Sequence, residues 1–199
     1  MGIKSSIKKV VKEADRKFFN SKITQFFKKN IRKDKMVGIS LDISGNCNLN
    51  CEACCFMEKY GEKGMMSLET FNKLEGLFPK ILGVELQCNA EPLLNPNIGE
   101  IIKSIKNENR NIQISLVTNG TLLNEKTASI LLESGIDRIS ISVDSCEKEL
   151  FEKLRRGANF ETVINNIRNT VNLKSKINDK CKIGIVTVSS KSNIHQLRD

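Results

Sequence analysis

The chain has 199 residues, of which 39% are hydrophobic and 28% are charged, and its formal net charge is +9. This composition is typical of a soluble globular domain. No apolar run approaches the roughly 18 residues of a membrane-spanning helix, and the N-terminus lacks the apolar core and cleavage site of a secretory signal peptide. We therefore expect a cytoplasmic protein without a transmembrane segment.

The positive charge is concentrated in residues 1–36, which contain 12 Lys/Arg and 3 Asp/Glu, whereas residues 37–199 contain 20 of each sign. Apolar residues in the first segment recur at steps of three and four, which predicts a basic amphipathic helical extension. Docking on the main domain, weak contact with a membrane surface and docking on an acidic partner all stay open. The aromatic residues do not alternate with lysines, which disfavours nucleic acid as a partner.

From residue 37 onward, short apolar segments typical of strands alternate with segments typical of helices. The predicted strands are residues 37–43, 81–87, 112–117, 136–143 and 182–188. The predicted helices are one capped by Ser67 and reaching Leu77, followed by residues 95–104, 124–133, 148–154 and 160–173. The strands are too apolar to alternate, so we expect them to be buried between helices. The pattern predicts an α/β domain over residues 37–199: a partial TIM-like barrel of about five βα units with parallel strands and functional loops after the strands.

Three of the seven cysteines, Cys47, Cys51 and Cys54, follow the first predicted strand with the spacing C-x3-C-x2-C. Without an export signal, metal ligation or simple burial is expected instead of disulfides. Three thiolates can hold an iron–sulfur cube and leave one iron open, whereas structural zinc usually takes four ligands. The spacing favours a cluster, while zinc and incidental cysteines stay open. Three other cysteines are expected to be buried or incidental, and the single histidine to lie on the surface: Cys88, Cys146, Cys181 and His195.

Several segments in chain order, each after a predicted strand or at a helix end, resemble the radical S-adenosylmethionine (SAM) superfamily. The loop Cys47-Asn48-Leu49-Asn50-Cys51-Glu52-Ala53-Cys54 is similar to its cluster loop. The later segments resemble its Gly-Gly-Glu-Pro, Thr-Asn-Gly, Ser-Leu-Asp and Ile-Arg-x-Gly motifs: Asn89-Ala90-Glu91-Pro92, Thr118-Asn119-Gly120, Ser142-Val143-Asp144 and Leu154-Arg155-Arg156-Gly157. The resemblance covers residues 37 to about 195, in the style of the branch with an additional C-terminal cluster domain (SPASM or twitch type).

The resemblance implies that Cys47, Cys51 and Cys54 hold a [4Fe–4S] cluster whose fourth iron is chelated by SAM. It further implies SAM contacts for eight other residues. Glu91, with the backbone of Asn89 and Ala90, would hold the methionine amino group. Ser142 would face the ribose or methionine part and Arg155 the carboxylate; Asp144 and Asn119 would lie nearby, and Ala53 would contribute a backbone contact. No side chain is assigned to the hydrogen abstraction itself.

The implied activity is that of an oxidoreductase that cleaves SAM reductively and abstracts hydrogen from a peptide or small metabolite. An external one-electron donor such as flavodoxin or ferredoxin is implied as a partner. A complete core of this family has six βα units, so we expect a C-terminally truncated chain whose missing half is a further partner. Two other functions stay open: a degenerate core that binds a cluster or zinc without chemistry, and an RNA-modifying protein that uses the basic N-terminus.

Two residues replace the glycines that precede the glutamate in the family motif, namely Asn89 and Ala90. If position 90 requires a positive φ, alanine costs about 1 kcal/mol there. Alanine at position 53 also replaces an aromatic residue that the family often has before the third cysteine.

Overall fold

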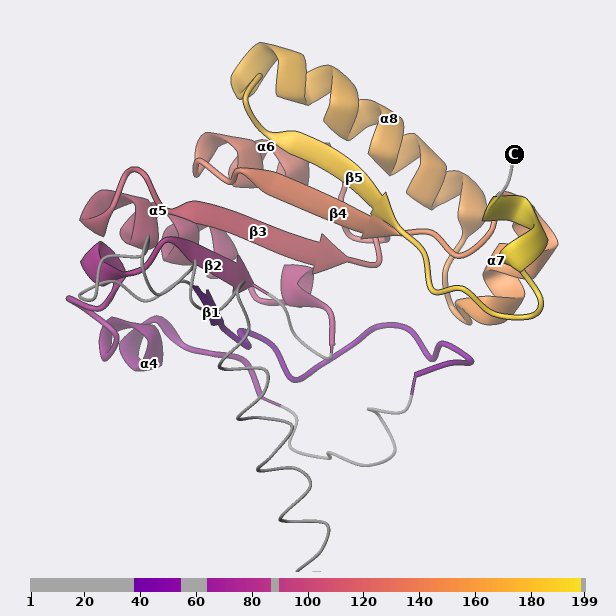
Figure 1. Ribbon diagram of the computed structural model, residues 1–199, viewed down its shortest axis with the longest axis horizontal. Coiled ribbons are helices and arrows are strands. Elements are labelled where there is room, and N and C mark those ends of the chain that lie inside the picture. Colours follow the sequence, from indigo (N-terminus) through magenta and orange to yellow (C-terminus); the bar gives the residue numbers. More distant parts are fainter. Residues whose placement is uncertain (1–37, 55–63, 87–89, 198–199) are drawn as a thin grey trace, which may run out of the picture. The chain divides into compact units, whose positions relative to one another are not determined.

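The computed structural model describes residues 38–54, 64–86 and 90–197. The predicted extension, residues 1–36, lies outside this part of the chain. The described strands are β1 (Ile39–Ser40), β2 (Gly83–Leu86), β3 (Gln113–Thr118), β4 (Arg138–Ser142) and β5 (Lys182–Val186). They form one sheet in the order β1-β2-β3-β4-β5, and every pairing is parallel (Figure 1). The predicted partial TIM-like α/β fold is confirmed.

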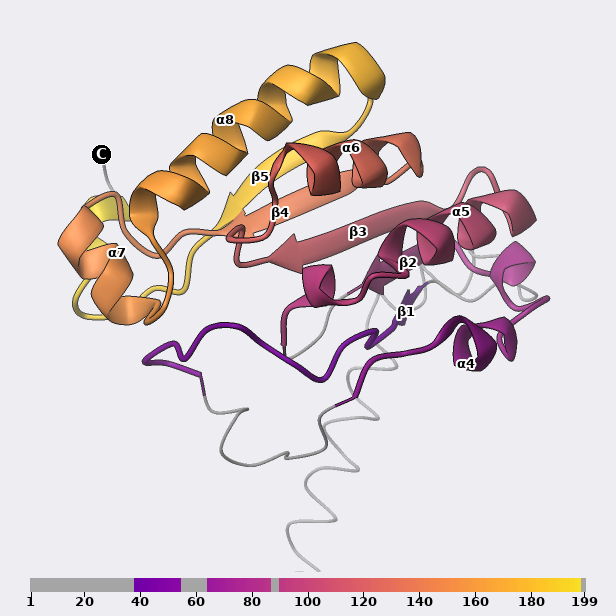
Figure 2. The same cartoon turned by 180° about the vertical axis from the view of Figure 1, so that it is seen from behind.

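Helices connect the strands and lie mainly on one face of the sheet. The α-helices are α4 (Leu68–Asn72), α5 (Ile98–Glu108), α6 (Glu125–Glu133), α7 (Lys148–Leu154) and α8 (Phe160–Ile177). The described residues also form short 3-10 helices: η1 (Phe78–Lys80), η2 (Pro92–Leu94) and η3 (Ile194–Leu197). Figures 1 and 2 show α5, α6 and α8 side by side over the same face. In the described part of the chain, no helix has the length and apolarity needed to cross a membrane.

The helix starts follow local capping chemistry. Ser67, Asn124 and Asn159 each accept a hydrogen bond from the backbone N–H three residues later, as N-cap side chains do. The helix after Ser67 is shorter than predicted, because α4 ends at Asn72 and does not reach Leu77. The chain continues in turns after the C-cap Lys73, and Gly76 adopts φ +80° at the last of them.

Burial differs between the strands: β4 is buried on both faces, with Ser140 8% and Ser142 9% exposed, so the prediction of buried strands holds there, whereas β2 and β3 are fully buried on one face only. In β2 and β3 buried residues alternate with partly exposed ones. The buried positions of β2 to β4 point toward the helices and form the centre of the core: Val84, Leu86, Ile114, Leu116, Ile139 and Ile141. On the opposite face, the residues of β2 and β3 are partly or fully exposed, whereas Ser140 and Ser142 of β4 are buried. At the edge of the sheet, Ile185 of β5 is 53% exposed.

The first strand is shorter than the predicted residues 37–43 because the chain leaves β2 soon after Leu41. The backbone of Ile43 instead accepts a hydrogen bond from Met66 N (3.0 Å), and Ser44 forms an antiparallel bridge with Met65. The buried side chain of Asn95 donates to both Ile43 O (2.7 Å) and Met66 O (3.0 Å). These bonds direct the following cysteine loop across the carboxyl ends of the strands.

Candidate functional site

A cavity of about 280 Å³ lies where the carboxyl ends of the strands meet the cysteine loop. In Figure 1 the arrowheads of β3, β4 and β5 point toward this side, where α7 also lies. The cavity brings together every predicted site residue that the structure describes. These residues are Cys47, Cys51, Ala53, Cys54, Ala90, Glu91, Asn119, Ser142, Asp144 and Arg155. Asn89, the remaining predicted site residue, lies outside the described residues.

Six further residues line the cavity without having been assigned to it from the sequence. They are Leu49, Val117, Thr118, Leu154, Val188 and Ser190. Val188 and Ser190 follow the fifth strand, so the rule that functional loops follow parallel strands offered a signal for them. Leu49 and Leu154 are apolar residues inside quoted motifs, and nothing in their type distinguishes them from core residues.

The cysteine loop is supported by the C-terminal end of α7. Asn50 N donates to Arg156 O (2.9 Å), and Glu52 N donates to Leu154 O (2.8 Å). Gly157 adopts φ +96°, and a Cβ there would lie 3.4 Å from Leu49 Cδ2. Glycine is therefore favoured at this position by both its backbone conformation and its closeness to the loop. Two of the sequence motifs thus form one structural unit.

A second set of hydrogen bonds ties the loop to the end of β3. Asn119 Nδ2 donates to Asn48 Oδ1 (2.9 Å), and Asn48 Nδ2 donates to Thr121 Oγ1 (2.8 Å). Thr121 Oγ1 in turn donates to Asn119 Oδ1 (2.7 Å), which closes a ring of three side chains. The backbone of Glu91 also donates to Asn46 O (2.8 Å). Asn119 therefore positions the cysteine loop in addition to lining the cavity.

The thiols of Cys47 and Cys51 are half-buried, and Cys54 is exposed. Burial raises the pKa of both Cys47 and Cys51, with further raising contributions from neighbouring thiols; Arg155 opposes the shift at Cys51. Three soft ligands at one cavity match the ligand preference of an iron–sulfur cluster, and metal binding would displace the thiol protons. Within residues 38–54, 64–86 and 90–197, no three His, Cys, Asp or Glu side chains converge on a single-ion site.

Glu91 is 1% exposed and lies at the back of the cavity. Its Oε1 accepts from Thr118 Oγ1 (2.6 Å) and Leu93 N (3.1 Å), and its Oε2 accepts from Asn119 N (2.8 Å). Burial raises the pKa of Glu91, and these donors only partly offset the shift. Since an ionised carboxylate offers about four acceptor sites, three protein donors leave room for one more.

Asp144 and Arg155 form a buried ion pair on the wall of the cavity. Arg155 Nε lies 2.8 Å from Asp144 Oδ2, and both side chains are 10% exposed. Arg155 Nε lacks a hydrogen bond of good geometry in the described part of the chain, although the opposite charge is close. Asp144 Oδ1 accepts from Val188 N (2.9 Å), so this carboxylate links the loops after β4 and β5 to the end of α7.

Ala90 has an ordinary backbone conformation, because no non-glycine residue in the described segments adopts a positive φ. The strain considered for alanine at this position is therefore absent. His195 is exposed, as predicted. Cys146 is exposed, and Cys181 is buried, which raises its pKa to about 11. Cys88 lies outside the described residues.

Comparison with known proteins agrees with this geometry. The sequence profile of the Radical SAM superfamily matches residues 41–193. A probable GTP 3′,8-cyclase of Methanococcus maripaludis is 35% identical over 134 residues, covering 66% of this chain and 44% of the relative. A GTP 3′,8-cyclase of Lactiplantibacillus plantarum is 29% identical over 161 residues, covering 78% and 47% of the two chains. This chain thus spans about half the length of the curated relatives it matches.

Solved structures share the fold at low sequence identity. The enzyme anSMEcpe with bound S-adenosylmethionine has a TM-score of 0.64 at 22% identity, over 82% of this chain and 47% of that one. Streptococcus suis SuiB bound to the precursor peptide SuiA has a TM-score of 0.62 at 19% identity, over 88% and 38%. Together with the superfamily match over most of the chain, these findings show that this protein belongs to the radical SAM superfamily, whose members use a [4Fe–4S] cluster and SAM.

Proposed function

We propose that this chain binds SAM and cleaves it reductively, with Cys47, Cys51 and Cys54 as the ligands of a [4Fe–4S] cluster. When bound, the reduced cluster supplies the electron that splits SAM into methionine and a 5′-deoxyadenosyl radical, which takes a hydrogen atom from the substrate. One observation carries the proposal: three thiols and the polar residues after β2, β3 and β4 line the same cavity.

The chemistry of the cavity residues supports distinct roles in holding SAM. Glu91 retains about one free acceptor site for the methionine ammonium group. Arg155 offers a guanidinium to the methionine carboxylate, and such charge-assisted contacts are strong when partly buried. The Ser142 hydroxyl makes no hydrogen bond within the described residues, and it lines the cavity, so it is available to the ribose or methionine part. The small side chains of Ala53 and Ala90 leave their backbone groups accessible.

The substrate is proposed from relatives alone. The curated relatives make GTP the first substrate to test, and the peptide-bound SuiB makes a peptide the second. Either compound would donate a hydrogen atom to the same radical and convert it to 5′-deoxyadenosine. Both assays therefore measure the amount of 5′-deoxyadenosine formed and, with a deuterated substrate, its deuterium content. A flavodoxin or ferredoxin is proposed as the electron donor.

Anaerobic reconstitution tests the proposal. We expect about four iron and four sulfide ions per chain, and 5′-deoxyadenosine that forms only with both SAM and dithionite. Cys51→Ser should lose iron and activity. Cys146→Ser is the matched control, because Cys146 is exposed and does not line the cavity. Zinc in place of iron, or a reducible cluster without SAM cleavage, would instead support a non-catalytic binding module.

A further inference from the structure

Asn193, which precedes η3, is a polar side chain that is only 1% exposed. Its Nδ2 donates to Asp144 O (2.7 Å) and Val188 O (2.9 Å). Its Oδ1 accepts from Ser190 N (2.6 Å) and Ser190 Oγ (3.1 Å). The amide therefore uses both of its ends, and it joins the loop after β4 to the loop after β5.

The bonds of Asn193 begin where the sheet ends. The β4–β5 pairing stops at Val186. Beyond this residue, the segments that follow the two strands are no longer held together by a backbone ladder. Thr187 Oγ1 donates to Val143 O (2.8 Å), and Val188 N donates to Asp144 Oδ1 (2.9 Å). Side chains thus replace the ladder and keep the two loops in a defined register.

This register determines one wall of the cavity. Val188 and Ser190 line the cavity, whereas Asn193 itself does not. The carbonyl of Asp144 is held by Asn193 and its Oδ1 by Val188 N, so its Oδ2 is directed toward Arg155 Nε at 2.8 Å. Arg155 also lines the cavity. Asn193 is therefore bonded to three cavity residues, Asp144, Val188 and Ser190, without lining the cavity itself.

We infer that Asn193 is a positioning residue for SAM: it sets the placement of Val188 and Ser190 and the orientation of the Asp144–Arg155 pair. This inference rests on the proposed function, because SAM is the ligand whose binding it predicts. It goes beyond the motifs of the cysteine loop and strand ends, none of which contains Asn193.

Asn193→Ala removes the donors and the acceptor together. We expect the equilibrium dissociation constant for SAM, measured on the reconstituted full chain without reductant, to rise about tenfold. The KM for SAM should rise likewise, while kcat should change much less. Asn193→Ser is the milder variant, since its hydroxyl is neutral, fits the buried position and keeps one donor and acceptor in place of the amide. It should weaken SAM binding in the same direction if Asn193→Ala fails to fold.

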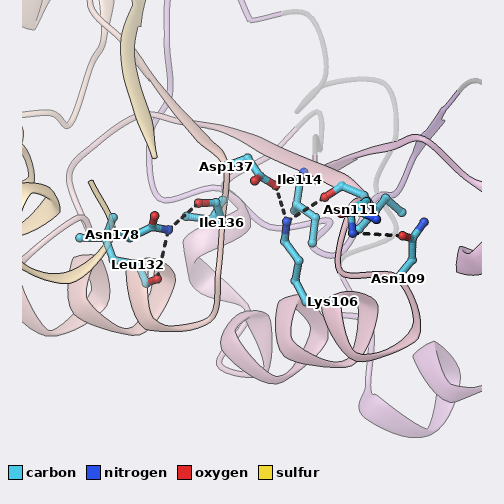
Figure 3. A network of polar contacts seen from close by, with 9 residues as sticks. Lys106, Asn109, Asn111, Ile114, Leu132, Ile136, Asp137 and Asn178 are labelled. Atoms are coloured by element: carbon cyan, nitrogen blue, oxygen red, sulfur yellow. Dashed lines mark hydrogen bonds and ion pairs between the residues drawn. The ribbon is translucent and has the colours of Figure 1, made fainter. Parts of the chain in front are cut away.

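Asn178→Ala is the matched control. Asn178 Nδ2 also bridges two carbonyls, Leu132 O (3.4 Å) and Ile136 O (3.1 Å), but at the amino end of the sheet (Figure 3). This variant should lower thermal stability without changing the SAM dissociation constant. Hydrogen exchange of the ligand-free chain adds a readout that needs no SAM. The backbone amides of Val188 and Arg155 should exchange faster in the Asn193 variants than in the wild type. Their exchange rates should be unchanged in Asn178→Ala.

The outcomes separate the inference from the proposed function. If the wild-type chain binds SAM but forms no 5′-deoxyadenosine, the proposed function fails, and weaker SAM binding by the Asn193 variants still supports the positioning role. If the Asn193 and Asn178 variants lose the same stability and both keep SAM affinity and local exchange, Asn193 is only structural and the inference is overturned. If the wild-type chain does not bind SAM, both fail.

Discussion

The two ends of the sheet contain similar polar residues but use them differently. At the amino end, Lys106 Nζ donates to Asp137 Oδ2 (2.6 Å) and Ile112 O (2.8 Å), and Ile114 N donates to Asp137 Oδ2 (2.7 Å) (Figure 3). These groups satisfy one another. At the carboxyl end, the thiols, Ser142 and Arg155 face a cavity and retain bonding capacity. One end therefore closes the fold, whereas the other is available to a ligand.

Asparagines that bridge backbone carbonyls show the same division. Asn109 and Asn178 each bridge two backbone carbonyls at the amino end. Asn95, Asn166 and Asn193 do so at the carboxyl end, where the bridged loops approach or line the cavity. The same local interaction thus stabilises the fold at one end and shapes a binding site at the other.

The largest expected effect is that of Asp144→Ala at the carboxyl end. It leaves the buried Arg155 charge without its partner and should lower the free energy of unfolding by about 3 kcal/mol. SAM binding should weaken as well, because the guanidinium loses its orientation. Urea denaturation of the cluster-free chain and calorimetric SAM titration of the reconstituted chain measure the two effects. Unchanged SAM affinity would mean that the Asp144–Arg155 ion pair does not contribute to the proposed SAM site.

Asp137→Ala is the corresponding change at the amino end. It removes the partner of Lys106 and the acceptor for Ile114 N, which should cost about 2 kcal/mol of unfolding free energy. SAM affinity should remain that of the wild type, because Asp137 does not line the cavity. The same urea and calorimetric measurements apply, and a weaker SAM affinity would contradict the separation of the two ends.

Gly157→Ala tests how the cysteine loop is supported. Alanine at φ +96° should cost about 1–2 kcal/mol. Relief of this backbone strain should shift Leu49, whose Cδ2 lies 3.4 Å from the added Cβ, and so reduce iron incorporation. Gly76→Ala is the control, because Gly76 has φ +80° but nothing within 4 Å of an added Cβ. It should lose similar stability and keep its iron. Equal iron content in the two variants would mean that α7 does not position the loop.

The last expected effect, confined to alkaline pH, is the pH dependence contributed by Cys181 near the amino end. Burial raises its pKa from the ordinary 9.0 to about 11. Between these values the folded chain binds more protons than the unfolded chain, so stability falls as pH rises. The contribution is complete below about pH 9 and is lost as pH passes about 11. Cys181→Ala should therefore show a shallower decline in unfolding free energy over this range, and parallel curves would refute the assignment.

Much of the fold follows from local patterns. The caps at Ser67, Asn124 and Asn159 depend on side chains bonding to backbone groups three residues away, and the bounds of α7 match the predicted residues 148–154. The motifs after the strands were also expected to lie together in one site, because the carboxyl ends of parallel strands meet at one edge of the sheet. Their ligands and roles remain proposals.

By itself, the sequence determined the order of strands and helices, the spacing of three thiols and the residues that follow each strand. Only the tertiary structure decided that the helices α5, α6 and α8 share one face of the sheet, that the end of α7 supports the cysteine loop, and that Asn193 joins two loops. The physical reason is that these contacts link segments far apart in the chain. Periodicity and capping describe neighbours within a few residues, whereas the hydrogen bonds of Asn50, Asp144 and Asn193 exist only once the strands have paired.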